Sequence, residues 1–451
     1  MEKWRLNGVV ADDGQTPIFD SYDVVVCGGG PAGVAAAVTS GRLGQKTLLI
    51  EKNGFCGGAA VAGLSATICG MYYGKEDPTT GAEQVVYGFT EEFRQRMEAR
   101  GGLTEPQVYG KTHVHTHDPI IWREVADDML LEAGVTCLYH TIISGVVMDG
   151  DAVRAVEVES SAGTSLIKAK KFIDATGDAA VIARAGFEFY YGDNGVIQNP
   201  TMMFRMANVD MEPFLEYFKG DTICPPEMIK DLTEKNESGE YSLPRNKVWV
   251  FPSTHDRVLM MNTTRLAGQD GRVLNVINPV DRTEAEIYGR RSTREYERYF
   301  REHVPGCQDA YLFDTGTEVG VRQTRSIKGV KVLTNEHVVE CRKCDDGVVR
   351  SPWPIELHSA SAPKLHWLYN DYYEIPYLTL VPEVGEDIIV AGRNLCAEHE
   401  ALASARVTAQ CFEYGHAAAV AADISIKQDV KFRDIKGEDV RAIMKERGSA
   451  L

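Results

Sequence analysis

The sequence has little positive charge and no long apolar run. Its 451 residues include 48 lysines and arginines against 65 aspartates and glutamates, a formal net charge of −17. This balance disfavours nucleic acid or an anionic membrane as the main partner. No apolar stretch approaches the roughly 20 residues that cross a bilayer, and residues 1–8 lack the apolar core of a signal peptide. We therefore expect a cytoplasmic protein without a membrane span.

Paired cysteine motifs are also scarce. The ten cysteines are scattered, and only Cys341 and Cys344 form a C-x-x-C pair. In a long chain without a signal peptide, such cysteines are expected to be free thiols. One pair without a second does not make a zinc site. We interpret it as a hairpin turn after a strand over residues 336–340, with a redox role as the alternative.

The best-defined motif is a glycine loop behind a short run of valines at 24–26. Gly28, Gly30 and Gly33 give G-x-G-x-x-G, with Pro31 at the start of a predicted helix. The spacing suits a tight turn, a close approach to a pyrophosphate and close packing of helix on strand. The free N–H groups at the helix start suit an anion. The motif alone leaves NAD and FAD open.

A second strand follows, and it ends in an acid. Residues 46–50 predict the strand, and Glu51 lies 18 residues beyond Gly33. This is close to the roughly 20 residues expected for a carboxylate that binds ribose hydroxyls. The acid favours FAD or NAD over NADP. Gly57 and Gly58 then make a second patch where a ligand can approach the main chain.

The pattern of elements predicts an α/β protein with a Rossmann-like FAD-binding domain that is interrupted by an inserted α+β substrate or cap domain. We expect helices near 90–99, 284–302, 401–424 and 437–447, and a strand meander over 135–174. The predicted division is an arm at 1–20, the first part of the FAD domain at 21–190, the cap at 191–375, the second part of the FAD domain at 376–430 and a tail at 431–451.

Three histidines alternate just before a predicted helix. His113, His115 and His117 would share one face of a strand, and Asp118 would cap the helix. Such a row can hold a metal, but no further ligand completes a site, so we predict none. A strand that lines the substrate mouth and a solvent-exposed strand are the alternatives, and we favour the exposed strand.

Several blocks together resemble a known family, the FAD-dependent oxidoreductases of the glutathione-reductase-2 type. This group holds the fumarate reductase and succinate dehydrogenase flavoproteins, and the chain is most similar to relatives with the flavin core of heterodisulfide reductase. The blocks are residues 28–33 with Glu51 and Gly57–Gly58, residues 174–178, residues 373–377, 389–394 and 398–406, and more weakly residues 320–325.

The resemblance implies one extended FAD. The helix from about Ala401 would point its N-terminus at the flavin N1–C2 edge, where a helix end stabilises negative charge. In some relatives a histidine near the second glycine patch bonds to FAD; none lies between Glu51 and Gly63, so we expect non-covalent FAD, with a bond to Cys56 as a remote alternative. The implied cofactor-binding residues are Gly28, Gly30, Pro31, Ala32, Gly33, Glu51, Lys52, Gly57, Gly58, Thr176, Gly177, Gly392 and Arg393.

The catalytic candidates are basic or phenolic residues of the predicted cleft. His399 precedes the flavin-facing helix, and Arg322 can grip a carboxylate or phosphate, although an interdomain ion pair is nearly as good an interpretation. Arg205, His358 and Tyr373 complete the set. Arg406 can instead pair with a core carboxylate.

We expect an enzyme that moves a hydride between flavin N5 and a small polar substrate at a CH–OH or CH–CH bond. One alternative is an electron-transfer subunit that serves a redox partner protein, and another is a flavin-dependent thiol–disulfide enzyme. The electron acceptor stays open, and a homo-oligomer is an expectation from the family alone.

Overall fold

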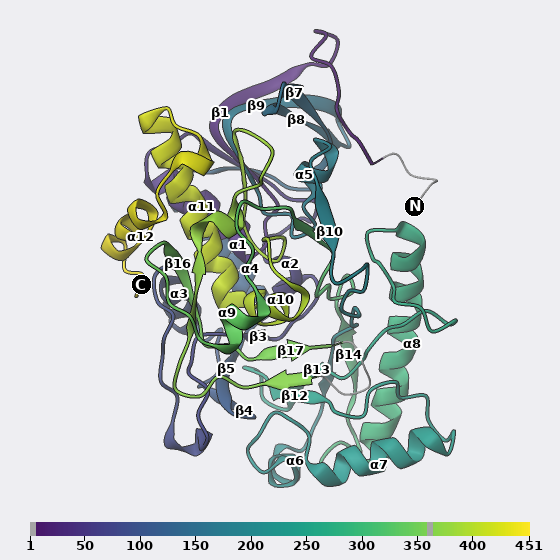
Figure 1. Cartoon of the computed structure of the whole chain (residues 1–451). Coiled ribbons are helices and arrows are strands. Elements are labelled where there is room, and N and C mark those ends of the chain that lie inside the picture. The colour runs from purple at the N-terminus through teal and green to yellow at the C-terminus, as the bar shows by residue number, and fades with distance from the viewer. Residues whose placement is uncertain (1–5, 359–363) are drawn as a thin grey trace.

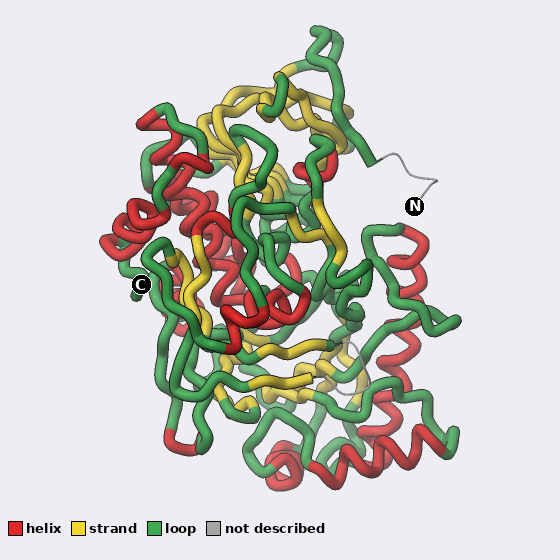
Figure 2. The backbone as a smooth tube through the Cα atoms, viewed as in Figure 1, coloured by secondary structure: helices red, strands yellow, loops and turns green. Residues whose placement is uncertain are grey.

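The computed structural model describes residues 6–358 and 364–451. Its elements form a large sheet covered by helices, in the upper part of Figure 1, and a smaller sheet with three helices below it (Figure 1, Figure 2). We call the upper part the main half and the lower part the cap. The mixed α/β class predicted from the sequence is confirmed.

The main sheet has seven strands. Strand β1 pairs in parallel with β2 and β9, and its valines at 24–26 are fully buried, as a strand covered on both faces requires. Strands β7, β8 and β9 form the antiparallel meander predicted over 135–174. The order is β6 (Thr136–Leu138), β2 (Thr47–Ile50), β1 (Ile18–Cys27), β9 (Gly163–Asp174), β8 (Ala152–Ser160) and β7 (Ile142–Asp149), and β20 (Ile388–Val390) pairs with the end of β9.

Small residues let two helices of the main half pack closely. A Cβ added to Gly415 would lie 1.9 Å from the carbonyl oxygen of Ala32, so glycine is required where α11 crosses α1. Within the described residues, none of the helices combines the length and apolarity that crossing a membrane requires. The helices are α1 (Pro31–Arg42), α2 (Gly58–Val61), α3 (Phe89–Glu98), α4 (Pro119–Glu132), α5 (Ala180–Arg184), α9 (Asn335–Val339), α10 (His399–Ala405), α11 (Thr408–Gln428) and α12 (Gly437–Glu446).

The cap has its own antiparallel sheet and hydrophobic cluster. The cluster runs from Phe204 to Ala310, whereas Val349 and Ile355 belong to the cluster of the main half. The predicted boundaries at 190 and 375 stay predictions. The long helix predicted over 284–302 is confirmed within α8. The sheet order is β12 (Trp249–Pro252), β13 (Val258–Asn262), β11 (Phe204–Ala207) and β14 (Tyr311–Thr315), and the helices are α6 (Met211–Phe218), α7 (Pro226–Glu237) and α8 (Pro279–His303).

Short strands and single turns of helix connect the two parts. A bridge between Val108 and Asp221 joins β4 to the cap. The short elements are β3 (Thr67–Ile68), β5 (Thr112–Thr116) and β4 (Gln107–Tyr109) in one sheet, the pairs β10 (Phe189–Tyr191) with β15 (Arg325–Ile327), β16 (Gly347–Ser351) with β19 (Tyr373–Pro376) and β17 (Ile355–Leu357) with β18 (Lys364–His366), and the 3-10 turns η1 (Pro78–Thr80), η2 (Tyr377–Leu380) and η3 (Phe432–Asp434).

The strand predicted over 336–340 is wrong, because this segment forms helix α9. The side chain of Thr334 caps the helix by accepting a hydrogen bond from the backbone N–H of His337 at 3.2 Å. This cap outweighs the strand preference of the two valines at 338 and 339. The C-x-x-C pair therefore joins a helix to β16 and is not the turn of a hairpin.

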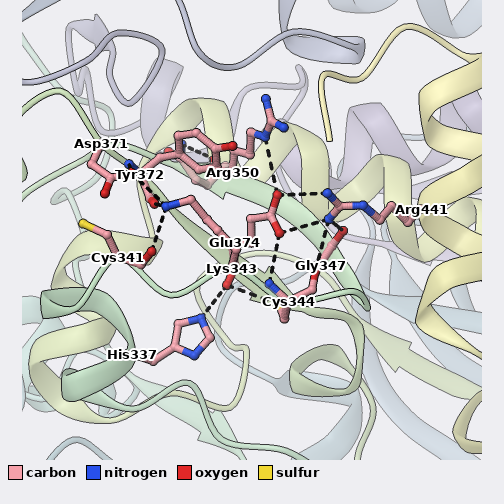
Figure 3. Close-up of polar contacts among 11 residues, drawn as sticks. His337, Cys341, Lys343, Cys344, Gly347, Arg350, Asp371, Tyr372, Glu374 and Arg441 are labelled. Carbon is pink, nitrogen blue, oxygen red and sulfur yellow. Dashed lines mark hydrogen bonds and ion pairs between the residues drawn. The ribbon is translucent and has the colours of Figure 1, made fainter.

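Glu374 anchors the turn that contains these cysteines (Figure 3). Its buried carboxylate accepts hydrogen bonds from the backbone N–H of Cys344 at 3.1 Å and from Arg441 Nη2 at 3.0 Å. Since Arg441 belongs to α12, this contact also fastens the last helix to β19. Burial raises the pKa of the Cys344 thiol to about 12, which keeps it protonated and unreactive.

The histidine strand is buried, so the predicted exposed strand is wrong. His113, His115 and His117 are 5%, 3% and 1% exposed. Strand β5 lies between β3 and β4, so both of its edges are paired. The His117 ring packs 4.7 Å from the ring of Trp122, and burial lowers its pKa to about 4. Among the described residues, no group of His, Cys, Asp and Glu side chains is placed to hold a metal ion.

Candidate active site

A cavity of about 400 Å³ lies between the main sheet and the cap. Its wall includes the first residues after four parallel strands, namely Gly28 after β1, Glu51 after β2, Ala175 after β9 and Gly392 shortly after β20. Ligands of open α/β sheets bind at the carboxyl ends of the strands, and the volume lies in the usual range for ligand pockets. The cavity is therefore the candidate active site.

The glycine loop forms one wall of this cavity. A Cβ on Gly30 would meet nothing closer than 3.9 Å, so that glycine leaves open space for a ligand. A Cβ on Gly33 would lie 1.7 Å from the carbonyl oxygen of Gly28, so this glycine packs behind the wall. Gly30 is the N-cap of α1 and has no side chain that occupies the free N–H groups of the helix start. Pro31 and Ala32 also line the cavity, and the loop can receive an anion.

Glu51 sits at the edge of the cavity with its carboxylate held by the backbone. Oε2 accepts a hydrogen bond from Gly29 N at 2.7 Å, and Oε1 accepts one from Asn53 N at 2.8 Å. Burial raises the pKa of this carboxyl. Lys52 lines the same wall and pairs with Glu318 at 2.6 Å, which connects the main half to the cap side.

The turn after β9 and the turn after β20 form the facing wall. The Thr176 hydroxyl donates a hydrogen bond to Asp174 Oδ1 at 2.6 Å, and Arg393 Nη2 donates to Asp178 Oδ1 at 2.6 Å. Thr176, Gly392 and Arg393 all line the cavity. A Cβ on Gly392 would meet no atom within 3.5 Å. Backbone N–H groups, a guanidinium and open glycine surfaces suit a phosphate-bearing dinucleotide.

In the second glycine patch, Gly58 lines the cavity and Gly57 does not. Gly177, from the turn after β9, also lines the cavity. The N–H of Gly57 donates to the carbonyl of Gly29 at 2.7 Å, so Gly57 supports the glycine loop from behind. Of the predicted cofactor residues, only Gly33 and Gly57 are absent from the wall.

The helix predicted over 401–424 is two helices, with a break at Arg406 and Val407. Val407 has extended backbone angles, φ −78° and ψ 167°, and caps α11. Arg406, Val407 and Thr408 all line the cavity. The long helix that starts at the cavity wall therefore begins at Thr408 and not near Ala401, and the break lets the Arg406 side chain reach the site.

A buried hydrogen-bonded group lines the cap side of the cavity. Tyr109 Oη donates to Glu356 Oε1 at 2.6 Å. Arg245 Nη2 lies 3.2 Å from His358 Nδ1, and a guanidinium can only donate, so Nδ1 accepts. The proton of the neutral ring is then on Nε2, which lies 3.5 Å from Glu356 Oε1. Burial and the charges of arginines nearby hold the pKa of His358 well below its usual range.

Glu356 is the charged member of this group. Burial alone would raise the pKa of its carboxyl, but His358, Tyr109 and Arg406 hold that pKa below its usual range. Burial and the Glu356 charge raise the pKa of Tyr109 well above its usual range. A carboxylate, a neutral imidazole and a protonated phenol therefore lie together at the wall.

The structure brings two of the five catalytic candidates to the cavity. Arg322 and His358 line it, whereas His399, Arg205 and Tyr373 do not. Arg205 Nε donates to Asp314 Oδ1 at 2.8 Å, and the Tyr373 hydroxyl lies 2.8 Å from that of Ser404. His399 begins α10, which ends before the chain reaches the cavity at Arg406. The catalytic roles of these three residues stay predictions, since none of the three lines the cavity.

Sequence reasoning missed Tyr109 and Glu356, and it gave Arg406 no place in the site. One pattern pointed to Glu356: it lies on β17, two residues before His358, which directly follows the strand, and this spacing favours one face for both side chains. No local pattern marks Tyr109, which reaches the site from β4. The cysteines at 56, 341 and 344 do not line the cavity, whereas Cys69 and Cys411 do.

This fold and this cavity are those of a dinucleotide-binding protein. The chain matches the family described as FAD dependent oxidoreductase over residues 23–444, and it belongs to that family. The protein is therefore an oxidoreductase with FAD as its cofactor, and the cradle of glycines, N–H groups and Arg393 fits that group.

Curated relatives match over shorter stretches. The chain is 53% identical to the dihydrolipoyl dehydrogenase of Trypanosoma brucei brucei over 45 residues, which are 10% of this chain and 9% of that protein. It is 24% identical to the digeranylgeranylglycerophospholipid reductase of Thermoplasma acidophilum over 243 residues, which are 52% of this chain and 54% of the relative. The chain thus spans about half the length of this relative and far less of the first.

One similar solved structure is a geranylgeranyl bacteriochlorophyll reductase-like protein from Thermoplasma acidophilum. The identity is 16%, the TM-score is 0.49, and the match covers 95% of this chain and 84% of that chain.

Proposed function

We propose that this FAD oxidoreductase exchanges a hydride with a small polar substrate at a CH–OH or CH–CH bond. The observation that supports this proposal is a single cavity lined both by the cofactor cradle and by the group of Tyr109, Glu356 and His358. FAD, when bound, supplies the hydride donor or acceptor. Relatives that are reductases by name agree with such a reaction.

The chain's own residues would hold the substrate and its proton. Tyr109 Oη keeps its proton because its pKa is raised, and this one O–H, which donates to Glu356 in the structure, would turn to a substrate oxygen when a substrate is bound. Glu356 accepts from Tyr109 and orients that hydroxyl. His358 positions Glu356 through its Nε2–H. The buried site keeps water away from this group.

We also propose that FAD is held without a covalent bond and that the chain is of the glutathione-reductase-2 type. Cys56, the thiol nearest the second glycine patch, does not line the cavity. The thiol–disulfide alternative has little support, since Cys341 and Cys344 lie outside the cavity wall and burial raises the pKa of both.

Anaerobic mixing of the holoenzyme with hydroxy acids, enoates, sugars and simple alcohols tests the proposal. At least one compound, alone or after chemical reduction of the flavin, should change the flavin absorbance between its oxidised and reduced spectra. Tyr109→Phe should slow that change at least tenfold with FAD content unchanged, because the phenyl ring keeps the packing and loses the proton. An equal rate in Tyr109→Phe would contradict the assigned role, and a chain that cannot be reconstituted with FAD would contradict the function.

A further inference from the structure

Three arginines surround one carboxylate at the cap end of the cavity. Arg245 and Arg322 are 2% and 6% exposed, and Arg406 is partly exposed where it lines the cavity. The acid near all three is Glu356, itself 5% exposed. Arginine stays charged in proteins, and His358 is neutral, so this group carries two positive charges more than negative ones.

Neutral partners hold the two arginines that face the cavity. Arg322 Nη1 donates to the carbonyl of Asn199 at 2.9 Å, and its Nη2 lies 3.3 Å from Asn262 Oδ1. Arg406 Nη2 donates to Gln198 Oε1 at 3.1 Å, and Arg406 Nε has no hydrogen-bond partner within the described ranges. Amide and carbonyl oxygens orient a guanidinium but do not cancel its charge.

Burying cations without counter-charge is expensive. Burial and the neighbouring Arg245 and Arg406 lower the pKa of Arg322 well below its ordinary range, which is the mark of an environment that disfavours this charge. Asn199, Asn262 and Gln198 accept hydrogen bonds from these two guanidiniums without neutralising them, and both arginines line the cavity. An oxyanion in the cavity would supply the missing negative charge.

The position of this group separates it from the cofactor's phosphates. The cradle for the pyrophosphate lies at the ends of the main-sheet strands, whereas Glu356 lies on β17 and Asn262 on β13, beside the cap sheet in Figure 1. Arg322 donates a hydrogen bond to Asn262, and both line the cavity together with Arg406 and Glu356. We take this part of the wall as the substrate's side.

We propose that Arg322 and Arg406 bind an oxyanion carried by the substrate, so the substrate is an organic carboxylate or a phosphate ester. This inference rests on the proposed function for the presence of a substrate in the cavity. Arg245 lies behind His358 and outside the cavity wall, so it adds positive potential without touching the ligand. A guanidinium can bind two oxygens of a carboxylate or phosphate at once.

Binding of simple probes to the wild-type holoenzyme tests the inference. Malonate, inorganic phosphate and the uncharged malonamide are titrated separately, and the flavin difference spectrum and calorimetry report binding. Malonate or phosphate should bind saturably, at least tenfold more tightly than malonamide. Tighter binding of malonate indicates a carboxylate substrate, and tighter binding of phosphate a phosphate ester. Equal affinity for malonate and malonamide, with no binding of phosphate, would overturn the inference.

An arginine variant locates the probe. Arg322→Gln should weaken the tighter anion about ten- to hundredfold, the range for losing a charge-assisted hydrogen bond, while FAD content stays within twofold. Arg301→Gln, an exposed arginine on α8, is the matched control and should change nothing. An unchanged anion affinity in Arg322→Gln would overturn the site. If that variant does not fold, the anion affinity of Arg322→Lys and the comparison of the three probes on the wild type test the site instead.

The two proposals fail differently. If a neutral alcohol bleaches the flavin and no anion binds or competes, the anion site is wrong and the proposed function stands. If malonate or phosphate binds through Arg322 and no compound of the panel changes the flavin spectrum, the site stands and the proposed reaction loses its support.

Discussion

The two ends of the cavity are lined by different kinds of groups. The cofactor end consists mainly of backbone and glycine surfaces at the ends of β1, β2, β9 and β20, whereas the cap end consists of buried side chains from distant segments, among them Tyr109, Arg322, Glu356 and Arg406. Backbone groups can bind a cofactor whichever side chains the surrounding residues carry. Side chains set charge and shape, so we propose that the cap end selects the substrate.

Removing the charge of Glu356 is the strongest test of the cap end. Glu356→Gln leaves the buried Arg245 and Arg322 and the partly exposed Arg406 without their nearby carboxylate, and we expect the free energy of unfolding to fall by about 3 kcal/mol. Denaturant titration of the holoenzyme measures this loss. Glu295→Gln, which removes a surface partner of Arg298, is the control and should cost at most about 0.5 kcal/mol. A loss below about 1 kcal/mol for Glu356→Gln would show that the cluster is not electrostatically coupled.

Filling the cradle tests the cofactor end. Gly30 has φ −70° and ψ −177°, a conformation open to any residue, so Gly30→Val should fold while its side chain occupies the space left for the ligand. We expect FAD affinity to fall about a hundredfold, or about 2.7 kcal/mol. Flavin content and fluorescence titration measure it, and circular dichroism checks the fold. Ala162→Val, in an exposed turn, should bind FAD like the wild type. Retention of FAD by Gly30→Val would contradict the cradle.

The sequence predicts the cofactor end of the cavity better than the cap end. The glycine loop, the strand that ends in Glu51 and the turn at Thr176 were predicted because each is a short local pattern with one physical purpose. Arg322 was proposed through the block that resembles the family, and His358 only as a further candidate of the predicted cleft. Tyr109 was missed because nothing local distinguishes it from a core tyrosine.

The errors have physical reasons too. The break before Thr408 was missed because alanine-rich sequence predicts continuous helix, while the cavity requires Arg406 at that point. His399 was predicted from its place along the chain; it does not line the cavity, and its catalytic role stays a prediction. The histidines at 113, 115 and 117 alternate as on an exposed strand, yet the rings of Tyr72 and Trp122 pack against them.

The pH dependence of stability tests a buried residue of the main half that lies outside the cavity, His117. His117 is 1% exposed, burial lowers its pKa to about 4, and neither of its ring nitrogens has a partner among the described residues. Because its folded pKa lies below the unfolded value, its stabilisation is complete above about pH 6.5 and is lost as the pH falls toward 4. Between pH 7 and pH 5, His117 alone should lower the free energy of unfolding by about 2 kcal/mol.

His117→Phe should remove this loss. The unfolding free energy of the variant should fall by about 2 kcal/mol less than that of the wild type over the same interval, with FAD affinity unchanged at pH 7. Denaturant titration at both values measures the difference. An identical pH dependence in the two proteins would show that His117 does not titrate on unfolding in this range.

The smallest effect is expected at the C-x-x-C pair. Cys341→Ser and Cys344→Ser should keep turnover within about twofold of the wild type, because neither thiol lines the cavity and half-buried thiols with a raised pKa are poor nucleophiles. Steady-state turnover of each variant and of the wild type, measured with and without a thiol reductant, tests this prediction. A large loss of turnover in either variant would revive the thiol–disulfide alternative.

The FAD dissociation constant of Arg322→Gln tests the division of the cavity most directly. If the cofactor end and the cap end are separate, the variant binds FAD within about twofold of the wild type while its affinity for the anionic probe falls at least tenfold. A tenfold or greater loss of FAD affinity, with the probe still bound as in the wild type, would place Arg322 in the cofactor site and contradict the account.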